Sequence, residues 1–408
     1  MKNLILYIFF LCMTIEAHSQ AKALNLQQCI DMALTKSYHM QVAAKGVEKA
    51  KNLIGTAWNV DKTEISLSQD PSSGGSTDNA LSVSQSIEFP TVYIARRAQL
   101  KAESQAEVSK TEVIKANLVY QVKSTYYQMV YETECFRILS KQDSILSKYR
   151  TVTETRYKAG DTRKLEYFTA ERMYKENKME MTAMLSKMEN TKLQLSTLLN
   201  SEMPIVPAEQ ILVPIDFVQK SFNYSLTPEG ELARNNIVVA NKAVATAKSE
   251  YAPSLSLALR NQFVISSWNP YHVDRSRFQE GNFLGFEVGV SFPLFYGATK
   301  AKVKAAKKDR EIAELVMRQE EKDRLREYLA ALSKSNSSHV RLTYYQEEGK
   351  DRSIQLEKLS HIEYENGEIS YLEYINALKD CIDFHMKRVR AINDYNQSVI
   401  TLERLMGK

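Results

Sequence analysis

The sequence predicts a mainly α-helical protein with a membrane β-barrel part, in which one structural plan occurs twice. The first observation is the stretch from Thr91 to Glu202, which lacks proline, holds the single glycine Gly160 and consists mostly of good helix formers. The second is that apolar residues alternate with polar ones in two other stretches, the spacing of β-strands. The third is that the order helix, β-hairpin, long helical hairpin repeats along the chain. All nine prolines fall outside the proposed long helices, which supports the assignment.

Residues 1–19 form a predicted secretory signal peptide. An apolar run at residues 4–13 follows Lys2, and small side chains precede the expected cleavage near Ser19-Gln20. The run is too short to serve as a membrane-spanning helix.

The cysteines predict neither a lipid anchor nor a disulfide framework. Leu11 precedes Cys12, where a lipid-attachment motif requires a small side chain. The other three, Cys29, Cys135 and Cys381, are odd in number, far apart and on predicted helices.

The charge pattern argues against a nucleic-acid partner. The net charge is +5, but 54 basic residues are interleaved with 49 acidic ones at helical spacing. Such interleaving is typical of solvated helix faces that carry ion pairs one turn apart.

The first structural repeat is predicted over residues 20–226. It begins with a helix over 24–58 that Asn25 can cap, followed by a β-hairpin at about 63–89. A long helical hairpin then spans 91–202. Its two arms meet at Gly160, the residue type expected just past a helix C-terminus. A connector with three prolines covers 203–226.

The second repeat is predicted over residues 227–408. Thr227-Pro228 starts a helix that ends before Pro253, a β-hairpin lies at about 254–292 with a loop at 266–282, and a long helical hairpin fills 298–406. Glu88-Phe89-Pro90 corresponds to Ser291-Phe292-Pro293. The segment from Tyr157 to Tyr167 corresponds to that from Tyr364 to Tyr374, so the chain is an internal duplication.

The four predicted strands have one apolar face and one face rich in Ser, Gly and charged residues. Val288 and Val290 are expected to face lipid, and Glu287 and Ser291 a polar lumen. Four strands cannot close a barrel, and a strand edge in lipid must be paired, so three copies would pool twelve strands. The alternative is a soluble antiparallel subdomain on a coiled-coil stalk.

Several local motifs carry a family resemblance over essentially the whole mature chain. They are Leu24-Asn25-Leu26 with Cys29-Ile30, Tyr251-Ala252-Pro253-Ser254, Phe292-Pro293-Leu294-Phe295, and Arg156-Tyr157-Lys158-Ala159-Gly160. Together with the order of elements, these motifs resemble the TolC-like outer membrane efflux proteins.

The resemblance implies a homotrimer with a twelve-stranded β-barrel in outer membrane lipid and an α-helical tunnel in the periplasm. It also implies partners: a periplasmic adaptor (membrane fusion) protein and an inner-membrane pump of the resistance-nodulation-division type. The function it implies is the exit duct of a tripartite efflux system that exports small molecules or ions.

The resemblance further implies a periplasmic gate at the helical tips. By spacing from the tip glycines, Glu166 and Glu373 match the family's aperture acids, and Tyr364 matches a tyrosine that bonds the first-half acid. The tip turns that would dock the adaptor contain Tyr157, Gly160, Asp161, Asn366 and Gly367. The alternative for both acids is that they are first-turn helix residues favoured by the helix dipole.

The motifs of enzymes are missing from the sequence. It has no phosphate-binding loop, no G-x-S-x-G motif, no paired cysteines and no histidine pair at metal-ligand spacing. We therefore expect no catalytic, cofactor-binding or metal-binding residues. The alternative function is that of a secreted periplasmic coiled-coil adaptor or tethering protein, which cell fractionation would distinguish from an outer membrane protein.

Overall fold

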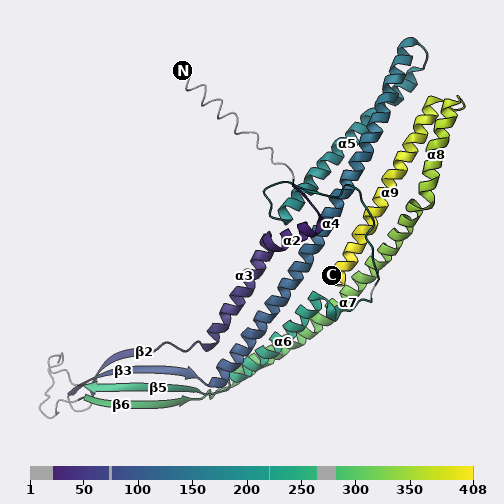
Figure 1. Cartoon of the computed structure of the whole chain (residues 1–408). Coiled ribbons are helices and arrows are strands. Elements are labelled where there is room, and N and C mark those ends of the chain that lie inside the picture. The colour runs from purple at the N-terminus through teal and green to yellow at the C-terminus, as the bar shows by residue number, and fades with distance from the viewer. Residues whose placement is uncertain (1–21, 73–75, 220, 264–281, 408) are drawn as a thin grey trace, which may run out of the picture. The chain divides into compact units, whose positions relative to one another are not determined.

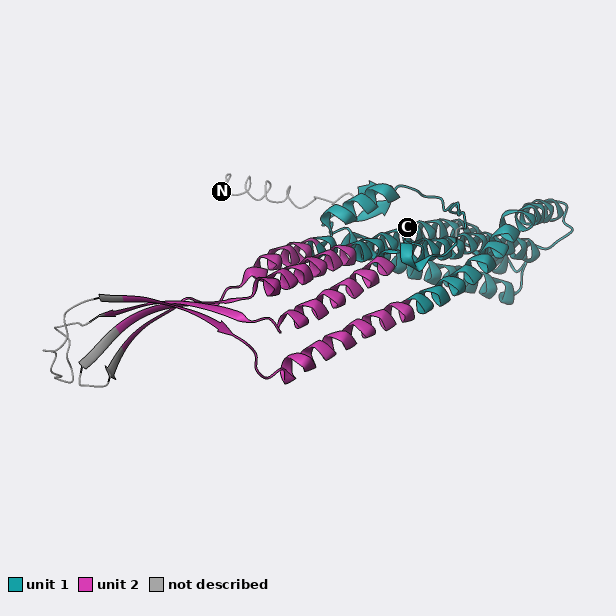
Figure 2. Cartoon of the chain, turned by 90° about the horizontal axis from the view of Figure 1, so that it is seen from below, with its two compact units in different colours: residues 1–43, 112–228, 321–408 teal, residues 44–111, 229–320 magenta. Residues whose placement is uncertain are grey.

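The computed structural model of the chain describes residues 22–72, 76–219, 221–263 and 282–407. The predicted signal peptide at 1–19, its cleavage site, and nearly all of the predicted loop at 266–282 lie outside these residues. The chain divides into two compact units, shown in different colours in Figure 2. Residues 44–111 and 229–320 form one unit, and residues 1–43, 112–228 and 321–408 form the other.

The unit of residues 44–111 and 229–320 (unit 2 in Figure 2), called the sheet unit here, contains an antiparallel sheet of four strands in the order β2-β3-β5-β6. The strands are β2 (Glu64–Ser72), β3 (Ser76–Glu88), β5 (Ser254–Phe263) and β6 (Asn282–Ser291). Both predicted hairpins are confirmed. The sheet also joins the two repeats, because β3 pairs with β5 from Asn79 opposite Phe263 to Glu88 opposite Ser254.

The first long helical hairpin is confirmed. Helix α4 (Pro90–Ala159) runs 70 residues, and α5 (Lys164–Leu198) returns from the turn at Gly160 (Figure 1). Gly160 has φ +82°, a left-handed conformation that costs glycine little because it has no Cβ. Asn177 and Lys178 of α5 bond to the Leu139 carbonyl and the Asp143 carboxylate of α4, which fixes the two arms side by side.

The prediction of a single helix over residues 24–58 is wrong, because the structure divides this stretch into several elements. The structure has strand β1 (Lys22–Leu24), helices α2 (Leu26–Lys36) and α3 (Tyr38–Leu53), and the 3₁₀ turn η1 (Ile54–Trp58). Asn25 caps α2 in a reciprocal capping box with Gln28, as expected for an Asn at this position. Ser37 ends α2 with extended ψ 143°, and its Oγ accepts the Met40 N–H, so the hydroxyl competes with the helical backbone pattern.

The second repeat begins as predicted with α6 (Pro228–Ser249), but its long descending arm is interrupted. Helix α7 (Gly297–Gln346) is followed by α8 (Glu348–Glu365), and α9 (Tyr371–Leu405) returns. Glu347, between α7 and α8, has φ −101° and ψ −94°, outside the helical region. At Gly349 the Phe384 ring of α9 approaches so closely that a Cβ would lie 2.6 Å from Cε2.

The connector, residues 203–226, contains a short strand and a 3₁₀ turn, although its three prolines predicted no regular structure. Strand β4 (Ile205–Pro207) pairs in parallel with β1, and the 3₁₀ turn η2 (Tyr224–Leu226) precedes α6. The partners are roughly 180 residues apart in sequence, so no local pattern predicts this pairing.

The main core of the other unit (unit 1 in Figure 2), called the helical unit here, lies where α2, α4, α9 and the connector meet. Tyr126 of α4 is fully buried in this core, and its hydroxyl donates to the Leu24 carbonyl of β1. Cys29, Cys135 and Cys381 are buried and free. Within the described residues, no helix is both long and apolar enough to cross a membrane.

Candidate functional site

The sheet has one largely apolar face, on which Gln85 and Asn261 are polar exceptions. Residues opposite each other in an antiparallel pair point to the same side, so the register assigns each residue to a face. Val290 lies opposite Leu255, Val288 opposite Leu257, and Phe286 opposite Leu259. The same face continues across β3 and β2 through Ile87, Val83, Leu81, Ile65 and Leu67. These side chains are largely exposed in the single chain, for example Phe286 at 78% and Ile65 at 69%.

The opposite face of the sheet is polar. It carries Ser66, Ser82, Ser84, Ser86, Ser254, Ser256, Arg260 and Glu287. Ser66 Oγ and Ser82 Oγ lie 3.2 Å apart across β2 and β3, within hydrogen-bond distance. Gly289 leaves room on this face, since a Cβ there would lie 2.3 Å from Ser256 Oγ. The sheet is thus amphipathic in the manner of a barrel wall.

The outer edges of the sheet have no partner strand within the described part of this chain. Strands β2 and β6 each pair with a single neighbour in the order β2-β3-β5-β6. An edge of this length presents a row of free backbone N–H and C=O groups. A second chain can satisfy these groups by adding its own strand.

The two helical tips have the same turn. In the first, the Asp161 N–H donates to the Arg156 carbonyl (2.8 Å) and the Gly160 N–H to the Tyr157 carbonyl (3.1 Å). In the second, the Glu368 N–H donates to the Glu363 carbonyl (2.8 Å) and the Gly367 N–H to the Tyr364 carbonyl (3.1 Å). Gly367, like Gly160, has positive φ (+77°). Asp161 and Asn366 are exposed at these turns.

A pair of tyrosine rings stacks across the turn of each tip. Tyr157 and Tyr167 stack with ring centroids 5.6 Å apart and nearly parallel planes. Tyr364 and Tyr374 stack at 4.8 Å with planes 9° apart. In both repeats the first ring stands three residues before the tip glycine and the second seven residues after it. Sequence reasoning missed Tyr167 and Tyr374 as partners, although this repeated spacing was the available signal.

The two helical hairpins meet at a cluster around Tyr149. This side chain of α4 is fully buried, and its ring makes an edge contact with Tyr371 of α9 at 5.4 Å. Its hydroxyl has no hydrogen-bond partner among the described residues. Burial, with the Glu166 carboxylate and Tyr371 nearby, raises the pKa of Tyr149 to about 12. The cluster therefore keeps Tyr149 neutral close to the acid Glu166.

The structure does not join Tyr364 to Glu166 by a hydrogen bond within the described part of the chain. The Glu166 carboxylate accepts from the Thr162 hydroxyl of its own turn, four residues earlier. The Tyr364 ring instead packs against Tyr371 and Tyr374. Both side chains are thus engaged within their own hairpins, and the contacts of Tyr364 are made by its ring.

Glu373 begins helix α9 in a capping box. Its carboxylate accepts the Ser370 N–H at 2.7 Å, and Ser370 Oγ accepts the Glu373 N–H at 3.2 Å. These hydrogen bonds from Ser370 lower the pKa of Glu373 from its usual value of 4.5, and the side chain is exposed. Glu373 is therefore a helix cap that also presents a negative charge to solvent.

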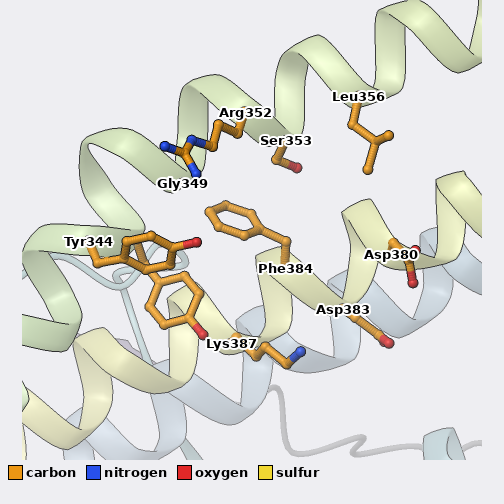
Figure 3. A pocket seen from close by; sticks show the side chains of 10 residues that line it. Tyr344, Gly349, Arg352, Ser353, Leu356, Asp380, Asp383, Phe384 and Lys387 are labelled. Carbon is orange, nitrogen blue, oxygen red and sulfur yellow. The ribbon is translucent and has the colours of Figure 1, made fainter.

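A pocket lies beside the break between α7 and α8 (Figure 3). Its volume is about 330 Å³, and the ring of Phe384 projects into it toward Gly349. Arg352, Asp380, Asp383 and Lys387 surround the ring, so the pocket has an aromatic centre and a charged rim. It has no pair of groups that resembles a nucleophile and its base.

Comparison with known proteins relates the C-terminal part of the sequence to one family and the fold to solved structures. Residues 232–408 match the outer membrane efflux protein family. No match was found among curated proteins.

Solved outer membrane channels share the fold of the whole chain. The CmeC channel of Campylobacter jejuni superimposes with a TM-score of 0.74 at 16% identity, covering 94% of this chain and 85% of that one. VceC of Vibrio cholerae gives 0.72 at 14% identity, with 94% and 96% covered. The open state of MtrE from Neisseria gonorrhoeae gives 0.73 at 17% identity, with 94% and 89% covered.

Proposed function

Because residues 232–408 belong to the outer membrane efflux protein family and the whole chain has the fold of solved outer membrane channels, we propose that this protein is the outer membrane exit duct of a tripartite efflux system. It would export small molecules or ions handed over by an inner-membrane pump through a periplasmic adaptor. The signal peptide predicted at residues 1–19 would direct it across the inner membrane.

The observation that carries this proposal is the amphipathic sheet with two open edges. Its apolar face suits lipid, its serine-rich face suits an aqueous lumen, and its edges require strands from elsewhere. Three copies supply twelve strands, which make a barrel with room for a channel. The trimer would bury the two edges of each copy against its neighbours and leave the apolar face in lipid.

The helical tips supply the periplasmic end of the duct. The exposed turns at Tyr157, Gly160, Asp161, Asn366 and Gly367 would dock the adaptor, since both turns present the same backbone shape. Glu166, Tyr364 and Glu373 would form the gate. We assign the holding interaction to the tyrosine stacks and the selectivity to the Glu373 charge.

Two measurements test the exit duct against a soluble periplasmic adaptor. The mature protein should sediment with outer membranes and resist extraction by high salt. Purified in detergent and added to a planar bilayer, it should produce discrete conductance steps. A soluble periplasmic pool together with an electrically silent bilayer would contradict the proposal and favour the coiled-coil adaptor.

A further inference from the structure

The start of helix α7 carries an unusual concentration of positive charge. Between Gly297 and Lys308 the sequence has five lysines and no acidic residue. Lys300, Lys304 and Lys307 are spaced i, i+4 and i+7, so they lie along one face of the helix, and all three are exposed. Val303, in the same segment, is buried, so one neighbouring side of the helix is covered while the lysine face is open.

These three lysines have no carboxylate partner within the described part of the chain. Their neighbours Lys302 and Lys308 differ, because they pair with Glu250 at 2.8 Å and Glu311 at 2.6 Å. The ammonium groups of Lys300, Lys304 and Lys307 therefore add their positive charge uncompensated to one surface.

A lysine in the first turn of α7, with no acidic residue beside it, does not stabilise the helix, because the helix dipole opposes it. The first turn of α7 begins where the Lys300 N–H bonds the Tyr296 carbonyl, and it contains no acidic residue. A helix N-terminus has partial positive charge and ordinarily favours Asp or Glu. Lys300 lies in this turn and adds to that positive potential, and Lys304 and Lys307 continue the positive charge along the same face, so the segment attracts anions.

The segment just before the lysines is apolar and exposed. It follows the end of β6 and contains Leu294, exposed at 81%, and Phe295, exposed at 92%, with Tyr296 next to them. Tyr296 packs against Tyr251 at the end of α6, with ring centroids 5.6 Å apart, so the segment is held in place. This order, from the apolar strand face to exposed aromatic residues to lysines, is the order of environments from hydrocarbon to headgroup.

We propose that Lys300, Lys304 and Lys307 bind the headgroups of anionic phospholipids in the leaflet that adjoins the helices. The inference rests on the proposed function, since it requires the apolar face of the sheet to lie in lipid. Phe295 and Leu294 would enter the interface below the headgroups. The lysines would contact the phosphates, where each cation near an anionic surface adds to the attraction.

The test measures lipid selectivity with spin-labelled lipids. The full-length protein is reconstituted into phosphatidylcholine vesicles that contain a trace of spin-labelled phosphatidylglycerol or spin-labelled phosphatidylcholine. Electron paramagnetic resonance then gives the fraction of each label that is motionally restricted at the protein surface. We expect phosphatidylglycerol to associate about threefold or more strongly than phosphatidylcholine, because cations near the surface attract the anionic headgroup.

Three comparisons assign the preference to these side chains. The variant with Lys300→Gln, Lys304→Gln and Lys307→Gln should bring the ratio near one, whereas Lys→Arg at the same positions should preserve it. The matched control replaces Lys322, Lys334 and Lys350, exposed lysines farther along the same helical arm, with Gln and should keep the wild-type ratio. In wild type, about 1 M salt should also abolish the preference, since the Debye length falls to about 3 Å.

The outcomes separate the two proposals. If no restricted lipid appears with either label, the sheet does not lie in lipid and the proposed function fails. If restricted lipid appears but wild type shows a ratio of one, the exit duct stands and the headgroup site is wrong. If the phosphatidylglycerol-to-phosphatidylcholine ratio stays above one after the three Gln substitutions, the headgroup site is also wrong. It is wrong too if those substitutions change the ion selectivity of the channel and leave the lipid ratio unchanged, because the lysines would then line the lumen.

Discussion

At the scale of single residues, each tip has a stacked tyrosine pair where the family resemblance implies a hydrogen bond from Tyr364 to Glu166. Tyr364 lies flat on Tyr374 and also touches Tyr371, while Glu166 bonds to Thr162 within its own turn. An aromatic pair of this kind contributes about 0.5–1.5 kcal/mol beyond the area it buries. The interaction depends on the ring and not on the hydroxyl.

Substitution of Tyr364 tests this distinction. Tyr364→Phe should leave the single-channel conductance unchanged, because Phe preserves the stack on Tyr374. Tyr364→Ala should loosen the tip, at a cost of about 0.5–1.5 kcal/mol per protomer, and raise the conductance or open probability in planar bilayers. If Tyr364→Phe opens the channel as much as Tyr364→Ala, the hydroxyl is the latch and the stack is incidental.

Glu373 supplies both a capping-box hydrogen bond and a negative charge, and the variants Glu373→Gln and Glu373→Ala separate these two properties. Glu373→Gln keeps a side chain able to accept the Ser370 N–H, so α9 should start normally while the charge is lost. Cation selectivity, measured as the reversal potential in asymmetric salt, should fall. Glu373→Ala should lose both the charge and the side-chain hydrogen bond of the capping box, and so also lower the thermal midpoint.

The direction of the pKa shift of Glu373 fixes the expected pH dependence. Because the folded-state pKa lies below 4.5, the cap contribution is fully present above that pH and is lost as pH falls through the lowered value. Wild-type selectivity should therefore be the same at pH 7 and at about pH 5. Glu368→Gln, which removes an exposed acid of the tip turn, serves as the charge control. If the reversal potential of Glu373→Gln equals that of wild type, the charge of Glu373 does not set the selectivity and the residue only takes part in the capping box.

At the scale of elements, the interruption between α7 and α8 distinguishes the second hairpin from the first. Helix α4 is continuous over 70 residues, whereas its counterpart stops at Gln346 and resumes at Glu348. Gly349 allows the Phe384 ring to lie against the α8 backbone. The ring thus fills space that any larger residue at position 349 would occupy.

Gly349→Ala should therefore destabilise the second hairpin. The new Cβ would lie 2.6 Å from Phe384 Cε2 and 3.1 Å from the Tyr344 carbonyl oxygen, and overpacking of this kind costs about 1–3 kcal/mol. Phe384→Leu should relieve part of that cost, so the double variant should be more stable than the two single effects predict. Gly297→Ala is the matched control, because its Cβ would meet no atom within 4 Å. Thermal unfolding followed by circular dichroism measures all four variants, and purely additive effects would contradict the contact.

The two faces of the sheet give a second prediction for an element. Val288 and Ala258 belong to adjacent pairs of the β5–β6 ladder but point to opposite faces. Val288→Arg should cost about 2–4 kcal/mol of stability if that face lies in mid-membrane lipid. Ala258→Arg should cost little, because it points to the polar face opposite Glu287. Urea midpoints in folded vesicles measure both, and equal losses would reverse or abolish the assignment of faces.

Local patterns predicted most elements, and the failures are non-local apart from the local break at Ser37. The glycines at both tips, the alternating strands and the Asn25 cap depend on a few adjacent residues, so the sequence shows them directly. The interruption at Glu347 has no proline or glycine at the position itself, and the Phe384 ring that packs against nearby Gly349 is distant in sequence. The tyrosine stacks were missed because the sequence shows a repeat without showing which rings face each other across a turn.

At the scale of the whole molecule, the open edges of the sheet specify how copies must meet. The strand order within one chain is β2-β3-β5-β6, so a closed ring requires β6 of one protomer to pair with β2 of the next. The contact is head-to-tail, and such contacts form a ring only if the rotation between copies closes. Under the proposed function three copies would close the ring with twelve strands, whereas an open chain of copies would leave edges exposed in lipid.

Cysteine cross-linking tests this closure directly. One substitution is placed on β2, Ile65→Cys, and the other on β6, at Leu284, Phe286 or Val288 in three separate double variants that sample the register. Oxidation of outer membranes should convert at least one double variant to a covalent trimer, with a dimer as the intermediate and no larger species. Neither single substitution should form trimers. Val83→Cys with Leu259→Cys is the control: these residues lie directly opposite on interior strands, so their disulfide should form within one chain. The native Cys29, Cys135 and Cys381 are buried and should not interfere. A ladder that continues beyond three copies, or cross-linking that stops at dimers in every register, would rule out the closed trimer.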